Sequence, residues 1–145
     1  MKTLPILFLS KQKRMLWPDL LQYSDTGFFF LRLAVGLVFV YHGLMKLKDP
    51  KGMAAMMGNP GMAWFPAVLG LVEFLSGLGV ILGVYFQLAA LFLAVLMVGA
   101  IMMKIGKWKV PFSAMDKMGW EFDLVLLAAA LAMLLGGGGA TFIIL

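Results

Sequence analysis

The chain has 145 residues, of which 63% are hydrophobic and 13% are charged. A typical soluble domain is about 45–50% apolar and about 25% charged, and a small domain leaves much of its surface in water. The composition therefore excludes a soluble fold. The net charge of +5 comes from basic residues in a tail and in loops, which is typical of contact with anionic lipid head groups and not of nucleic-acid recognition.

Residues 1–27 are predicted to form an N-terminal tail, and residues 28–145 a transmembrane domain. The apolar stretch at 4–9 is too short for the core of a signal peptide, and a basic cluster follows it instead of preceding it, so we expect the tail to be retained. Four apolar residues recur at helical spacing and favour a short interfacial helix, with a disordered extension as the alternative. They are Leu16, Trp17, Leu20 and Leu21.

Four apolar runs predict four membrane-spanning helices. They lie at 28–45, 63–82, 85–103 and 120–135. A spanning helix needs about 20 residues, so the fourth is short. The second and third runs are joined by a tight turn at Gly83 and Val84, whereas turn-forming residues predict loops at 47–62 and 104–119. The sequence thus predicts an all-α, four-transmembrane-helix bundle with an N-terminal interfacial segment, multi-pass in a prokaryotic cytoplasmic membrane.

Lysines give a signal for the orientation in the membrane. Seven of them follow the first and third helices: Lys46, Lys48, Lys51, Lys104, Lys107, Lys109 and Lys117. The positive-inside rule places both lysine loops in the cytoplasm. The basic cluster of the tail, at residues 11–14, argues for the opposite orientation.

Ionisable residues inside membrane spans usually face the interior of a bundle. In this chain they include Arg32, His42, Lys46, Glu73, Glu121 and Asp123. At about 1.5 Å per helical residue, Arg32 lies about 6 Å and Glu73 about 14 Å from the same side of the membrane. An Arg32–Glu73 ion pair is therefore expected. The alternative is that Arg32 reaches the head groups and Glu73 is protonated or bonded elsewhere.

His42, Lys46, Glu121 and Asp123 are predicted to share one depth layer near the opposite surface. Such a cluster could handle protons at a quinone site, with His42, Glu73 and Glu121 as the candidate catalytic residues. The simpler interpretation, which we favour, is a layer of helix caps and ion pairs at the interface.

Small residues mark the faces through which helices pack. They are Gly36 and Gly43 in the first helix and Gly70 and Gly77 in the second. Glycine allows the backbones of membrane helices to approach closely, so the first two helices are expected to face each other.

Electron-carrier ligands are scarce in the sequence, which has no Cys and one His. This composition excludes a disulfide, an iron–sulfur cluster and a bis-His haem within one chain. We expect no metal site and no cofactor bound by this chain alone.

Taken together, these features resemble the DoxX family of small membrane proteins, over roughly residues 28–139. The resemblance is carried by Arg32-x3-Gly36-x2-Phe39-x2-His42-Gly43-x2-Lys46, by Met57-Gly58-Asn59-Pro60-Gly61, by Glu73-x3-Gly77, by Gly119-Trp120-Glu121 and by the glycine-rich end. It implies a four-helix membrane bundle and a link to quinone-coupled redox chemistry, because members resemble or accompany subunits of terminal quinol oxidases and thiosulfate:quinone oxidoreductases.

The resemblance favours an accessory, cofactor-free subunit of a membrane redox or respiratory complex. The alternatives are a quinone-reactive oxidoreductase subunit and a membrane carrier or assembly factor. Quinone is the one cofactor that stays a candidate. The expected partners are the lipid bilayer and other membrane subunits, without nucleic acid, and whether the chain is an enzyme stays open.

Overall fold

The computed structural model describes residues 16–140, and every regular element in that range is a helix. The elements are the 3-10 helix η1 (Pro18–Tyr23), α2 (Ser24–Lys48), α3 (Pro50–Met56), α4 (Trp64–Leu82), α5 (Phe86–Gly106) and α6 (Trp120–Gly136). The predicted all-α class is confirmed. The first 15 residues of the predicted tail, and the apolar end after residue 140, lie outside the described residues.

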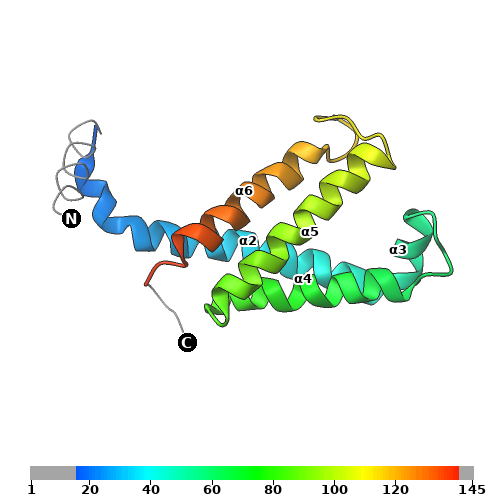
Figure 1. Cartoon of the computed structure of the whole chain (residues 1–145), viewed down its shortest axis with the longest axis horizontal. Coiled ribbons are helices and arrows are strands. Elements are labelled where there is room, and N and C mark those ends of the chain that lie inside the picture. The colour runs from blue at the N-terminus through cyan, green and yellow to red at the C-terminus, as the bar shows by residue number, and fades with distance from the viewer. Residues whose placement is uncertain (1–15, 141–145) are drawn as a thin grey trace, which may run out of the picture.

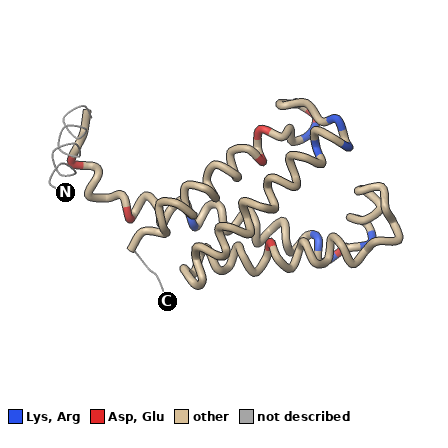
Figure 2. Tube along the Cα trace, in the orientation of Figure 1, with Lys and Arg blue, Asp and Glu red and all other residues tan. Residues whose placement is uncertain are grey.

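Three helical segments of the described range are long and apolar enough to cross a membrane. They are the continuous η1–α2 segment Pro18–Lys48, α4 and α5. The remaining long helix, α6, has 17 residues, which is the lower end of the length that spans a bilayer. Figure 2 shows the basic residues gathered mostly at the loop ends of the helices, with long uncharged stretches between. The chain is therefore a multi-pass membrane protein.

The long helices are arranged as two antiparallel pairs. α2 packs along α4, and α5 packs along α6. Figure 1 shows the two pairs converging near the α4–α5 turn and diverging toward α3 and the 107–119 segment. The turn is tight because Gly83 ends α4 with a φ of 74°, and the Val84 N–H donates to the Gly79 carbonyl at 3.0 Å. That left-handed conformation suits glycine.

Glycines set the close packing and the register of α2 against α4. Gly36 lies against Gly77, and Gly43 lies against Gly70. A Cβ atom at Gly43 would lie 2.6 Å from the Gly70 carbonyl oxygen, which is too close for any real side chain. The first two helices therefore face each other through glycine, and this register decides which polar side chains can meet.

The segment 47–62, predicted to be a loop, contains the short helix α3. The Gly52 N–H donates to the Asp49 carboxylate at 2.8 Å, and Pro50 occupies the first helical position. An Asp cap followed by proline is a recognised helix start. After α3, the remainder of the segment forms turns as predicted, and Gly58 adopts a left-handed φ of 78°.

Candidate functional site

The first ion pair of the site joins α2 to α4. The Lys46 ammonium binds both carboxylate oxygens of Glu73. The Glu73 side chain is 6% exposed and the Lys46 side chain 18%, so the acid deep in the membrane domain is neutralised by a lysine. The structure thereby corrects the expected Arg32–Glu73 pair.

Helix register and side-chain direction explain this choice of partner. Gly43 packs against Gly70 and Phe74, so the α2 residue level with Glu73 lies close to His42. At about 1.5 Å per residue, Lys46 is about 6 Å from that level and Arg32 about 15 Å on the other side. Side chains tilt toward the N-terminus of their own helix. Lys46 therefore points back toward Glu73, whereas Arg32 points away from it.

Arg32 lies instead between aromatic rings at the opposite end of the bundle. The residue is 0% exposed. Its guanidinium carbon lies 5.7 Å from the ring centroid of Phe29 and 5.8 Å from that of Phe86, which are distances of cation–π contacts. Because Phe86 begins α5, Arg32 connects the two helix pairs beside the α4–α5 turn.

The second ion pair joins α5 to α6. The Lys104 Nζ lies 2.7 Å from an Asp123 carboxylate oxygen, with side chains 17% and 10% exposed. The same ammonium donates to the Gly119 carbonyl at 3.3 Å. Each antiparallel helix pair therefore contains one ion pair that links its two helices.

His42 lies near both ion pairs. The half-buried imidazole is within electrostatic range of all four of their charged groups, and its ring centroid lies 6.5 Å from that of Phe122 on α6, edge to face. We call the five residues concerned the charged layer: His42, Lys46, Glu73, Lys104 and Asp123. The sequence placed three of them together, and the structure adds Glu73 and Lys104.

Glu121 stands apart from the charged layer. Its backbone N–H donates to the Phe112 carbonyl at 3.1 Å. One of its carboxylate oxygens is buried and has no hydrogen-bond partner among the described residues. The side chain lines an open pocket with Asp116 and Lys117, and Phe122 forms a wall of both this pocket and the one beside His42. Glu121 and His42, which were predicted to form one cluster, thus line two neighbouring pockets that share Phe122 as a wall.

The pocket beside His42 opens on the outside of α2 and α6. It has an empty volume of about 540 Å³ and is lined by Leu37, Val38, Tyr41, His42 and Phe122. Apart from the imidazole and the phenol, its walls are hydrocarbon. A lipid-soluble molecule in this pocket would lie against the His42 side chain, whose imidazole accepts and donates protons.

The structure also shows what the sequence reasoning missed. Lys104 and Asp123 stand near the end of α5 and the start of α6, and an antiparallel connection brings such positions to one membrane surface. From that placement the Lys104–Asp123 ion pair could have been predicted. Phe122 carried no signal of its own, since one aromatic residue among many is not distinctive. Within residues 16–140, no group of three or more His, Cys, Asp or Glu side chains could hold a metal ion.

Comparisons with known proteins identify a family and two similar proteins. The DoxX family model matches residues 27–108, which include every residue of the charged layer except Asp123. The chain is similar to "Putative oxidoreductase CatD" of Bacillus subtilis, with 30% identity over 114 residues that cover 78% of this chain and 81% of that protein. It is also similar to "Uncharacterized membrane protein Rv3486" of Mycobacterium tuberculosis, with 36% identity over 92 residues, or 60% of this chain and 56% of the relative.

No solved structure matches the chain. Because the family match covers more than half of the sequence and includes both helices that hold the Lys46–Glu73 pair, the chain belongs to the DoxX family.

Proposed function

We propose that this protein is an accessory subunit of a redox complex in a prokaryotic cytoplasmic membrane and that it has no electron carrier of its own. The observation that supports the proposal is the charged layer, in which His42 lies near two partly buried ion pairs. These groups can hold and pass protons. The chain has no Cys and one His, so a Cys-bound iron–sulfur cluster or a bis-His haem needs ligands from another subunit. The similarity to "Putative oxidoreductase CatD" supports a redox role.

The test is purification of the tagged chain from its native membranes in a mild detergent. We expect it to elute with a partner that carries a cytochrome, flavin or iron–sulfur spectrum, and with quinone-dependent redox activity in the same fractions. A chain that elutes alone, while the redox activity remains in other fractions, would contradict an accessory role.

A second candidate function is a quinone-reactive site in the same subunit. The observation that favours it is the apolar pocket beside His42 on the outer side of α2 and α6. Reduction of a quinone consumes two electrons and two protons. In this candidate the electrons come from the partner subunit. His42 passes one proton to a quinone oxygen and regains it, through the charged layer, from water at the membrane surface, and the second proton reaches the other quinone oxygen from the same water.

The second candidate is tested by the quinone content of the purified complex. His42→Ala and Glu73→Gln are expected to lower the quinone extracted per mole of protein. Leu44→Ala is the matched control, because Leu44 lies on α2 outside the pocket. If both site variants retain normal quinone content and normal activity, the quinone site is elsewhere and the accessory role stands alone.

A further inference from the structure

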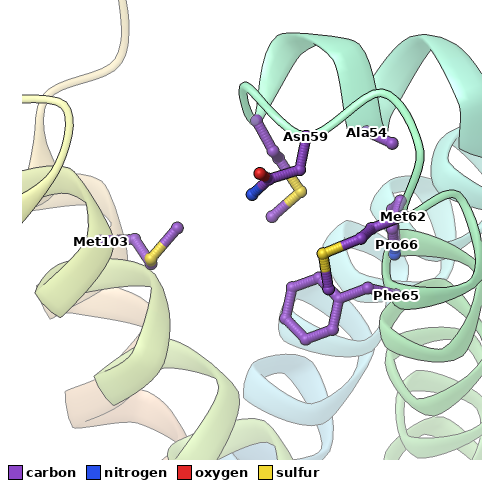
Figure 3. Close-up of a pocket in the computed structure, with 7 residues that line it drawn as sticks. Ala54, Asn59, Met62, Phe65, Pro66 and Met103 are labelled. Atoms are coloured by element: carbon purple, nitrogen blue, oxygen red, sulfur yellow. The ribbon is translucent and has the colours of Figure 1, made fainter.

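Another apolar pocket lies between the two helix pairs, away from the pocket beside His42. Its empty volume is about 370 Å³, which includes space open to the surroundings. Figure 3 shows Met103 of α5 facing Met62 and Phe65 across the gap, with Asn59 at its edge. The lining consists of Ala54, Met57, Asn59, Met62, Phe65, Pro66 and Met103.

The pocket exists because α4 and α5 diverge. Beside their turn the two helices touch, and a Cβ atom at Gly79 would lie 3.1 Å from the Ala89 Cβ. At the other end, the helix pairs separate (Figure 1), and the side chains of Phe65 and Met103 leave space between them. An empty space of this kind forfeits dispersion contacts. In a bilayer, the material at hand to fill an apolar space is an acyl chain.

The lining suits such a chain. Asn59 carries the one polar side chain among the lining residues, so the part of a ligand that enters must be hydrocarbon. Three of the other residues are methionines, whose flexible thioethers adapt to irregular shapes.

A cation is hydrogen-bonded to one of the residues that line the pocket. Lys107, exposed at the end of α5, donates from its Nζ to the Met57 carbonyl at 2.8 Å. An ammonium has three N–H donors, so this contact leaves donors for a further acceptor such as a phosphate oxygen. The same hydrogen bond connects the end of α5 to the α3–α4 segment. An apolar pocket next to a cation matches a phospholipid with a negative head group.

We propose that this pocket binds one anionic phospholipid, with an acyl chain between α4 and α5 and the phosphate on the Lys107 ammonium. The lipid fills the space where the two helix pairs diverge and stabilises their separation. The proposal does not depend on the redox role, because neither Lys107 nor the pocket belongs to the charged layer.

The test uses the full chain, delipidated in detergent, with phosphatidylglycerol and phosphatidylcholine of identical acyl chains as the probes. Native mass spectrometry counts the lipids retained per protein. We expect one retained phosphatidylglycerol and about a fivefold preference for it over phosphatidylcholine, as expected for one lysine near an anionic lipid. Lys107→Gln should remove that preference. Lys117→Gln, a lysine of the same loop that lines the separate pocket beside Glu121, should keep it.

The acyl-chain half of the proposal has its own pair of variants. Met103→Trp fills the pocket and should prevent retention of either phospholipid, whereas Met102→Trp, at a position that is 68% exposed, should leave retention unchanged. Retention in Met103→Trp equal to that in Met102→Trp would show that no chain enters the pocket. Equal loss of preference in Lys107→Gln and Lys117→Gln would show diffuse charge attraction instead of a site. Either result overturns the proposal.

Discussion

The ammonium of Lys46, near the end of α2, binds the carboxylate of Glu73, in the middle of α4. The acid is placed where unpaired charge is most costly, and the lysine reaches it by extending back along its own helix. The pair lies on the glycine-lined contact between α2 and α4, next to the imidazole of His42. Packing of the first helix pair and the electrostatics of the candidate site therefore depend on the same two side chains.

Lys46→Met should strongly destabilise the protein. The substitution keeps the length of the side chain but leaves the Glu73 carboxylate buried without its cation, which typically costs about 3–5 kcal/mol. The measurement is the free energy of unfolding in detergent micelles, followed by the loss of helical circular dichroism as denaturant is added.

Two further variants complete this experiment. The double variant Lys46→Met/Glu73→Gln should recover most of the lost stability, because the remaining amide is uncharged. Lys48→Met removes an exposed lysine two residues away and should change stability little. If Lys46→Met proved as stable as the wild type, the Lys46–Glu73 pair would have to be abandoned.

The ion pair between Lys104 and Asp123 should show a measurable coupling energy. In a double-mutant cycle with Lys104→Met and Asp123→Leu, contacting residues typically couple by about 0.5–3 kcal/mol. A reference cycle that combines Lys46→Met with Asp123→Leu joins residues of different pairs and should be additive within about 0.5 kcal/mol. Equal coupling in both cycles would mean that the four charges act as one network and not as two separate pairs.

Gly43→Ala should separate the first two helices. The added methyl group would lie 2.6 Å from both the Gly70 carbonyl oxygen and the Phe74 backbone nitrogen. Overpacking of this kind costs about 1–3 kcal/mol, more than alanine gains in helix propensity. Gly99→Ala is the matched control on α5, where a Cβ meets nothing within 4 Å. Thermal unfolding should show a lower midpoint for the first variant and an unchanged or higher midpoint for the second.

The orientation of the chain can be read with single cysteines, because the natural sequence has none. Tyr85→Cys reports on the α4–α5 turn, where Tyr85 is 80% exposed, and Met115→Cys reports on the lysine loop, where Met115 is fully exposed. The positive-inside rule predicts that a membrane-impermeant maleimide labels Tyr85→Cys in intact cells. It should label Met115→Cys only after the cells are lysed. The reverse pattern would place the lysine loops outside.

The helices could be predicted from the sequence because hydrocarbon around the chain forces its backbone to bond internally. A long apolar run therefore has to form a helix. The predicted helix end at Leu82 and the predicted helix start at Trp120 agree with the structure. The short helix α3 was missed although Asp49 and Pro50 form a start signal for a helix. The glycines that follow in the same segment outweighed that signal.

The partner of Glu73 could not be predicted from depth alone. An estimate of depth from residue number ignores the direction of the side chain. Arg32 and Lys46 both extend toward the start of α2. That direction brings one cation toward Glu73 and carries the other away. The pairing thus needed the register of α2 on α4, which rests on the contacts of Gly36 and Gly43 with glycines of α4.

The 17 residues of α6 have a consequence for the surrounding lipid. At about 1.5 Å per residue the helix is about 25 Å long, a few ångströms less than the hydrocarbon thickness of an average bilayer, about 30 Å. Hydrophobic mismatch of this sign is relieved by local thinning of the membrane beside the helix or by contact with other proteins. Of the four long helices, α6 is therefore the one that falls furthest short of the thickness of an average bilayer.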